Sequence, residues 1–201
     1  MIGHMDDMDP RVVTVIGAGV AGTQSILKAI DNKALVKVVD SSQSKLDDLK
    51  SKYGTENVEY ILSSKDSIQV SVNESDLVIG SVYVVGKEAP KVVTKDMLSS
   101  MNPGTVMVDV SIDQGGCFET SKPTTHQDPT FLIDDILHYC VSNMPGAVPL
   151  TASESLNSAS LSYVQKLANN DLNLLLNEQD FKSGLNIMAG EFRHPSLIDI
   201  I

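Results

Sequence analysis

The 201-residue sequence contains no tryptophan and only two cysteines. Cys117 and Cys140 are too few for a disulfide framework and lack the spacing of a metal site, so they are typical of a reducing compartment. No apolar run reaches the length of a membrane span, and no signal peptide precedes the first predicted strand. We therefore expect a cytoplasmic protein that is not inserted in a membrane and has no metal site.

Basic residues are also scarce, since 15 Lys and Arg stand against 26 Asp and Glu, for a formal net charge of −11. No stretch is rich in Lys or Arg, so we expect neither nucleic acid nor an anionic membrane as a partner. Hydrophobic residues make up 42% of the chain, which is enough for a sizeable core. The length favours one domain, or one domain with an appendage.

The most informative segment reads VVTVIGAGVAG and begins with a β-branched run, Val12–Ile16. Three glycines follow in the spacing of a dinucleotide-binding turn between a strand and a helix. Gly17 permits the sharp turn, Gly19 lets the backbone approach a pyrophosphate, and Gly22 lets the helix pack closely on the sheet. The helix that begins near Val20 would direct free N–H groups at the phosphates. The alternative is a tight turn without a ligand.

Asp40 closes the second apolar run, Leu35–Val39, and completes the dinucleotide-binding pattern. Its carboxylate would accept hydrogen bonds from ribose hydroxyls and would repel a 2′-phosphate. Ser41 and Ser42 follow where a protein that binds NADP would carry an arginine. The sequence therefore predicts NAD as the cofactor.

Strand and helix patterns alternate as far as about Asp113, which is typical of a parallel sheet with helices on both faces. From Ser153 the pattern becomes one long helix followed by shorter helical pieces. We therefore predict an α/β fold of the doubly wound Rossmann type with a C-terminal helical extension. The expected parts are a disordered or cloning-derived leader (1–10), a dinucleotide-binding domain (11–150) and the extension (151–201).

Polar side chains follow two predicted strands at the edge of the sheet where ligands bind. Asp113 lies just beyond the strand Thr105–Val110, where it would handle a proton or orient a substrate group, or else cap a turn. Asn143 is either a turn residue or an amide donor, and Met144 is expected to be a packing residue. His126 and His138 are interpreted as structural.

Two long segments, VDVSIDQGGCFETSKPTTHQDPTF and HYCVSNMPGAVP, resemble alanine dehydrogenase. The resemblance extends from Val12 to about Gly190. It implies a cytoplasmic hexamer that converts L-alanine, NAD and water reversibly to pyruvate, ammonium and NADH. The NAD-binding subunit of proton-pumping transhydrogenase is less similar, because it usually carries glutamate in place of Asp113 and lacks the HYCVSNMPGAVP segment.

The resemblance also implies roles for individual residues. Asp113 would be the active-site aspartate, and Asp40 would bind the adenosine ribose. The remaining cofactor-binding positions would be Gly17, Ala18, Gly19, Val20, Ala21, Gly22, Ser81, Val82, Asn143 and Met144. Val85 departs from the family pattern, where proline is common.

In the family, a substrate-binding arginine and lysine and a catalytic histidine belong to a further domain, and this sequence has no counterpart for them. Three interpretations follow. The chain is a truncated enzyme that is inactive alone, or one half of a split dehydrogenase completed by an N-terminal chain, or a non-catalytic NAD-binding or oligomerisation module. L-alanine or pyruvate would bind only if the substrate domain is supplied. The chain could also assemble with copies of itself into a homo-oligomer.

Overall fold

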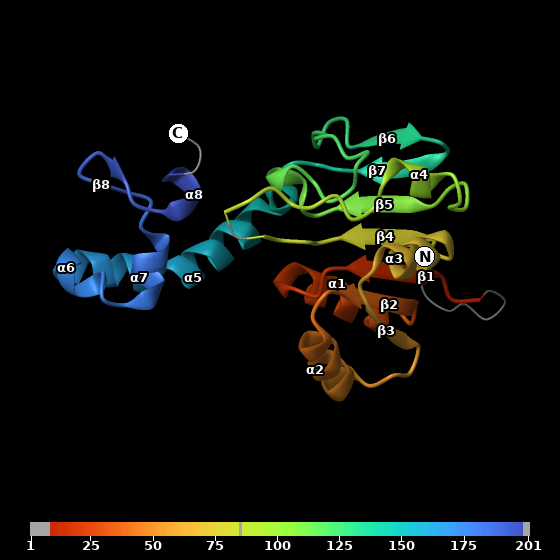
Figure 1. The fold of residues 1–201 in the computed structure, drawn as a ribbon, viewed down its shortest axis with the longest axis horizontal. Helices are drawn as coiled ribbons and strands as arrows, with labels where there is room; N and C mark the ends of the chain where they lie inside the picture. Colours follow the sequence, from red (N-terminus) through yellow and green to blue (C-terminus); the bar gives the residue numbers. More distant parts are fainter. Residues whose placement is uncertain (1–8, 85, 199–201) are drawn as a thin grey trace. The chain divides into compact units, whose positions relative to one another are not determined.

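The computed structural model describes residues 9–84 and 86–198. Residues 1–8 of the expected leader, and Val85, lie outside the described residues. The chain divides into two compact units, one up to Met144 and one from Pro145 onward, and each is described by itself (Figure 1). The division of roles between residues 11–150 and 151–201 stays a prediction.

The first unit is built on a seven-stranded sheet with the order β3-β2-β1-β4-β5-β7-β6 (Figure 1). All neighbouring strands are parallel except β6 and β7, which are antiparallel. The strands are β1 (Val12–Ile16), β2 (Leu35–Asp40), β3 (Val58–Leu62), β4 (Leu77–Gly80), β5 (Val106–Asp109), β6 (Thr130–Ile133) and β7 (Ile136–Tyr139). The predicted doubly wound sheet is thus confirmed, and β6 is an antiparallel edge strand that the sequence analysis does not predict.

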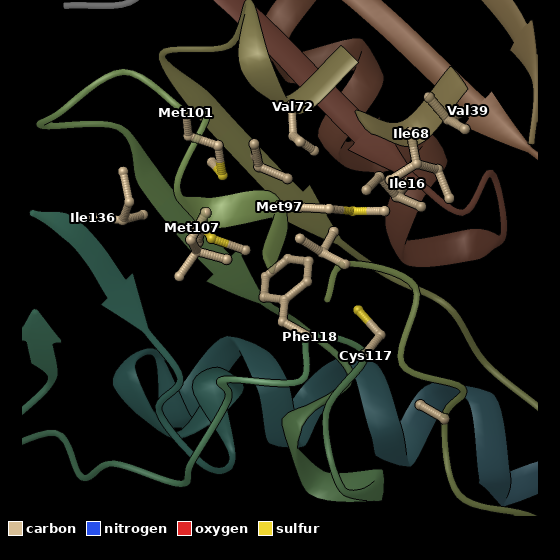
Figure 2. Packing of buried hydrophobic residues seen from close by; sticks show 14 residues of the cluster. Ile16, Val39, Ile68, Val72, Met97, Met101, Met107, Cys117, Phe118 and Ile136 are labelled. Atoms are coloured by element: carbon tan, nitrogen blue, oxygen red, sulfur yellow. The ribbon is translucent and has the colours of Figure 1, made fainter. Parts of the chain in front are cut away.

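Helices cover both faces of this sheet, because side chains of successive strand residues point to opposite faces. Val13 and Val15 pack with α1 (Val20–Asp31) and α2 (Gln43–Tyr53) in one apolar cluster. Ile16, the next strand residue, belongs to a second cluster. The second cluster also contains residues of α3 (Lys65–Asn73) and α4 (Lys95–Leu98), and Figure 2 shows Phe118 between Met107 and Cys117 within it.

The structure also contains two 3₁₀ helices. The helix η1 (Ile112–Gln114) lies in the first unit, and η2 (Met144–Ala147) spans the boundary between the two units. The second unit contains α5 (Pro149–Asn169), α6 (Leu172–Leu175), α7 (Gln179–Gly184), β8 (Ile187–Met188), β9 (Glu191–Phe192) and α8 (Pro195–Ile198). Proline stands at the first position of α5, where its missing N–H costs no helical hydrogen bond. No helix in the described part of the chain is long and apolar enough to cross a membrane.

The helix α5 buries none of its residues. Its apolar side chains lie within one broad face and are largely exposed: Leu150, Leu156, Leu161, Tyr163, Val164 and Leu167. Burial of such side chains is the usual source of stability of an amphipathic helix. Tyr163 contacts the ring of Phe181 in α7, with 5.9 Å between centroids, but most of this apolar face stays exposed.

His138 of β7 is buried and structural. Its Nδ1–H donates to the carbonyl of Ile136 at 3.1 Å, and the Thr120 hydroxyl donates to Nε2 at 2.8 Å. The ring stacks on Phe131 with 4.9 Å between centroids. Burial, the largest influence, lowers the pKa of His138 below its ordinary value of 6.5.

The fold should consequently lose stability in mild acid. Because the native state stabilises the neutral ring, the contribution of His138 is complete above about pH 6.5, and it is lost as the unfolded chain takes up a proton below that value. We expect His138→Gln to lower the free energy of unfolding by about 1–3 kcal/mol at neutral pH, and the difference from wild type to shrink near pH 5.5.

Urea denaturation at the two pH values measures this effect. His126→Gln, a substitution at an exposed histidine, is the matched control and should retain the wild-type loss of stability in acid. An identical pH dependence in wild type and His138→Gln would contradict the assignment.

Candidate cofactor site

A cavity of about 580 Å³ opens at the carboxyl ends of β1, β2, β4 and β5. In doubly wound sheets, this edge is where ligands bind, at the point where the strand order reverses. Its lining residues come from the end of β2 and from the loops and first helical turns that follow these four strands: Gly17, Gly19, Val20, Ala21, Asp40, Ser41, Lys45, Ser81, Val82, Tyr83, Val110, Ser111, Asp113 and Gln114.

The three glycines of the turn each have a different spatial requirement. Gly17 has φ of +97°, and a Cβ there would lie 2.6 Å from the carbonyl oxygen of Ser81. A Cβ on Gly22 would lie only 1.8 Å from the carbonyl oxygen of Gly17, so the helix cannot approach the strand this closely with a larger residue. A Cβ on Gly19 would meet no atom within 4 Å. Gly19 therefore borders open space, as expected where a ligand contacts the backbone.

The helix α1 begins at this turn without a side-chain cap. Gly19 is the N-cap residue, and no acidic side chain stands in the first helical turn. The first backbone N–H groups of a helix have no partners within the helix, and they carry its positive dipole end. Val20 and Ala21 line the cavity, so this end of α1 can receive a phosphate anion.

Asp40 fixes the glycine turn from the end of β2. Its carboxylate accepts hydrogen bonds from Ala18 N–H at 2.7 Å and from Ser42 N–H at 2.8 Å. Only 7% of the residue is exposed. Lys45, in the first turn of α2, places its ammonium 3.9 Å from Asp40 Oδ2 and also lines the cavity.

Ser81 joins the turn to the neighbouring strand. Its hydroxyl donates to the carbonyls of Ile16 at 3.2 Å and Gly17 at 2.7 Å. Because Ser81 follows β4 directly, these bonds hold the two loops at the point where the strand order reverses. This contact gives Ser81 a role in shaping the cavity wall.

A second carboxylate, Asp109 at the end of β5, is fully buried. It accepts hydrogen bonds from the N–H groups of Ser111 at 3.0 Å, Cys117 at 2.8 Å and Phe118 at 3.2 Å, and also from the Ser121 hydroxyl. These bonds replace the water that a buried charge loses. Asp109 thereby fixes the loop that carries Asp113.

Asp113 and Asn143 lie together, although 30 residues separate them in the sequence. The N–H of Asn143 donates to both carboxylate oxygens of Asp113, at 3.1 and 3.3 Å. Asn143 has φ of +53°, a left-handed conformation that asparagine tolerates better than most residues. His126 donates from Nε2 to the Asn143 carbonyl at 3.2 Å. Asp113 remains exposed and lines the cavity.

Eight of the predicted site residues therefore line the cavity: Gly17, Gly19, Val20, Ala21, Asp40, Ser81, Val82 and Asp113. Ala18 and Gly22 belong to the glycine turn but do not line the cavity. Asn143 and Met144 are also not among the described lining residues. The sequence analysis missed Lys45, Tyr83, Val110, Ser111 and Gln114. Lys45 could have been predicted as a lining residue, because it lies in the first turn of the helix that follows Asp40. The first turn of a helix after a parallel strand lies at the edge of the sheet where ligands bind.

The cysteines take no part in this site. Both are free and buried, and burial raises the pKa of the Cys117 and Cys140 thiols, with the nearby Asp109 charge adding to the effect. They are therefore neutral thiols. Within residues 9–84 and 86–198, no three His, Cys, Asp or Glu side chains gather in a way that could hold a metal ion.

The family model described as "Alanine dehydrogenase/PNT, C-terminal domain" matches residues 1–195. The chain belongs to this family. Alanine dehydrogenase of Halomonas elongata is 46% identical over 191 residues, which cover 94% of this chain and 51% of the relative. Alanine dehydrogenase 2 of Staphylococcus aureus is 41% identical over 201 residues, which cover 99% of this chain and 54% of the relative.

A solved L-alanine dehydrogenase matches the whole chain and 56% of its own, with a TM-score of 0.87 and 39% identity. The transhydrogenase of Sinorhizobium meliloti matches 73% of this chain and 42% of its own, with a TM-score of 0.64 and 25% identity. The predicted family, its NAD-binding Rossmann-type fold and its NAD cofactor are thus confirmed. The chain spans about half the length of the curated relatives it matches.

The geometry of the glycine turn predicts that two glycine substitutions differ in their effect on stability. Gly22→Ala forces a Cβ into the Gly17 carbonyl and should destabilise the fold by about 1–3 kcal/mol or more. Gly19→Val places its side chain in the cavity and should change the free energy of unfolding by less than about 1 kcal/mol. Denaturant unfolding of both variants measures the difference, and a Gly22→Ala variant as stable as wild type would contradict this description of the turn.

Proposed function

We propose that this chain is the cofactor-binding part of an alanine dehydrogenase, in which NAD(H) occupies the cavity beside the glycine turn. The observation that carries the proposal is the open space at Gly19 next to the uncapped N-terminus of α1. A pyrophosphate at this position accepts hydrogen bonds from helical N–H groups and interacts favourably with the helix dipole. Gly19→Val should therefore abolish cofactor binding while the fold persists.

Asp40 and Lys45 bind the adenosine end in this proposal. The Asp40 oxygens keep acceptor capacity beyond the two backbone bonds, which suits the hydroxyls of the ribose. A 2′-phosphate would meet the same carboxylate and be repelled. Lys45 would attract that phosphate, so Asp40 is required to exclude NADP despite the lysine beside it.

We expect wild type to bind NAD at least about tenfold more tightly than NADP. Asp40→Asn removes the repelling charge and leaves Lys45 in place, so the ratio of NADP to NAD affinity should rise. NAD affinity should fall, because the amide oxygen can accept only one of the two backbone bonds. Adding Lys45→Met to Asp40→Asn should remove this gain, because the attracting charge is then lost. Calorimetric titration of both cofactors measures these affinities.

Asp48→Asn, at an exposed carboxylate on α2, is the matched control and should keep the wild-type selectivity. Equal affinity of the wild-type chain for the two cofactors would refute the selectivity that we assign to Asp40.

The reaction that we propose for the complete enzyme converts L-alanine, NAD⁺ and water to pyruvate, ammonium, NADH and a proton. When bound, NAD accepts the hydride from the substrate carbon. Asp113 lies beyond β5, on the half of the sheet that receives the nicotinamide end in doubly wound folds. Its exposed carboxylate would handle a proton or orient the amino group of the substrate. Asn143 and Met144 would lie beside the nicotinamide.

The other side of the active site would come from the part of the relatives that this chain does not match. We propose that the apolar face of α5 packs against that part, or against another copy of the chain in a homo-oligomer. Leu150 is 72% exposed and Leu156 is 70% exposed, which favours such a contact over a free helix. The complete protein would act in the cytoplasm, where its two thiols stay reduced. A non-catalytic NAD-binding or oligomerisation module is the alternative that the same face supports.

A polypeptide of residues 1–201 alone should show no appreciable alanine dehydrogenase activity. Hydride transfer requires the substrate carbon about 3–3.5 Å from the nicotinamide, and such positioning contributes on the order of 7–11 kcal/mol to lowering the barrier. We expect NADH fluorescence at alkaline pH, with L-alanine and NAD, only after the N-terminal part of a relative is supplied.

Asp113→Asn in the complemented enzyme is the control for a genuine signal, and it should reduce the rate strongly. Robust turnover by residues 1–201 alone, lost in Asp113→Asn, would disprove the need for a substrate-side domain.

A further inference from the structure

The segment that follows the loop after β4 runs alongside the loop that carries Asp113. Ala89 N–H donates to the carbonyl of Gln114 at 3.0 Å, and Val92 N–H donates to the carbonyl of Cys117 at 2.8 Å. Val93 then forms a parallel bridge with Phe118. Residues 89–93 therefore act as a short extra strand beside residues 114–118, outside the main sheet.

This ladder is interrupted at its centre. Between the bonded carbonyls of Gln114 and Cys117 lie those of Gly115 and Gly116, while the segment opposite offers Pro90 and Lys91. Proline has no N–H to donate. The two glycines have φ of +86° and +75°, so their carbonyls depart from the direction of an ordinary strand.

The side chain of Lys91 supplies the missing donors. Its Nζ donates to the carbonyl of Gly116 at 2.7 Å and also to the carbonyl of Gly115. Four consecutive carbonyls, 114 to 117, thus receive hydrogen bonds from residues 89–92, two of them from one ammonium group. Charge-assisted bonds of this kind are stronger than bonds between neutral groups.

These bonds hold together two walls of the cofactor cavity. The segment of Lys91 continues from Val82 and Tyr83, which line one wall, and Gly115 follows directly after Asp113 and Gln114 in the other. The Ser111 hydroxyl joins the same walls near the sheet by donating to the Val82 carbonyl at 2.8 Å. Ser111 thus joins the two walls close to the sheet, and Lys91 joins them farther from it.

We propose that Lys91 is a positioning residue for the nicotinamide half of the site, which sets the place of the Asp113 turn without touching the cofactor. The inference rests on the proposed function, because it requires NAD in this cavity with its nicotinamide end beside Asp113. Lys91 does not line the cavity, and its ammonium is occupied by the two glycine carbonyls. The glycine turn and Asp40 lie in other loops, so the adenosine half does not depend on Lys91.

Comparison of two ligands tests this separation. Calorimetry with NAD and with ADP-ribose, which lacks the nicotinamide, measures each half of the site on the same chain. Lys91→Met keeps the length of the side chain and removes its donors, so NAD affinity should fall about tenfold or more while ADP-ribose affinity stays within about twofold. Lys91→Arg keeps a charged donor and should restore NAD affinity to within about threefold of wild type.

Lys87→Met, an exposed lysine in the same loop, is the matched control and should bind both ligands like wild type. Retained ADP-ribose binding shows that Lys91→Met is folded. An equal loss of both ligands, or unchanged NAD binding, in Lys91→Met would overturn the inference. Failure of the wild-type chain to bind either ligand would instead overturn the proposed function, and the inference with it.

Discussion

Hydrogen bonds from backbone N–H groups to buried strand-end carboxylates maintain the shape of the cavity. Asp40 ends β2 and Asp109 ends β5, on opposite halves of the sheet. Each accepts a bond from the N–H two residues later, at Ser42 and at Ser111, and so stabilises a turn directly after its strand. Asp40 also accepts a bond from Ala18 and so joins its own loop to the glycine turn. Asp109 also accepts bonds from Cys117 and Phe118, which hold the far part of its own loop against the end of β5.

This arrangement explains how irregular loops keep an open site between them. Buried N–H groups outside helices and sheets need partners, and the carboxylates supply several at once. Gly116 shows how closely the chain is fitted around Asp109, because a Cβ there would lie 2.7 Å from Oδ2. Loss of either carboxylate would leave several buried N–H groups without a partner. The backbone segments that donate to that carboxylate would then be displaced.

The glycine turn that forms one wall of the cavity was predictable from the sequence because its signals are local. Gly17, Gly19 and Gly22 act within a single turn, and each has the spatial environment that its place in the pattern predicts. Strand ends also follow from the apolar runs, which placed Asp40 and Asp113 at the correct edge of the sheet.

The parts that the sequence did not reveal depend on contacts between distant segments. Asp109 binds N–H groups farther along its own loop, and Lys91 binds carbonyls of a different loop. A backbone N–H or carbonyl has no residue-type signature. The direct bond between Asn143 and Asp113 likewise requires a left-handed conformation that spacing alone does not predict. The strand β6 was missed because it is a short, half-exposed edge strand at the end of a polar segment.

The three acids at the edge of the sheet have different roles because they differ in burial. Asp109 is fully buried and Asp40 nearly so, and both accept hydrogen bonds from two or more backbone N–H groups. Asp113 is exposed, and a single N–H, that of Asn143, is shared between its two oxygens. Asp109 and Asp40 thus hold loops in place through several backbone bonds, whereas Asp113 faces the cavity with oxygens that can accept further hydrogen bonds. In the function that we propose, Asp113 is therefore the acid of the three whose geometry suits contact with a substrate.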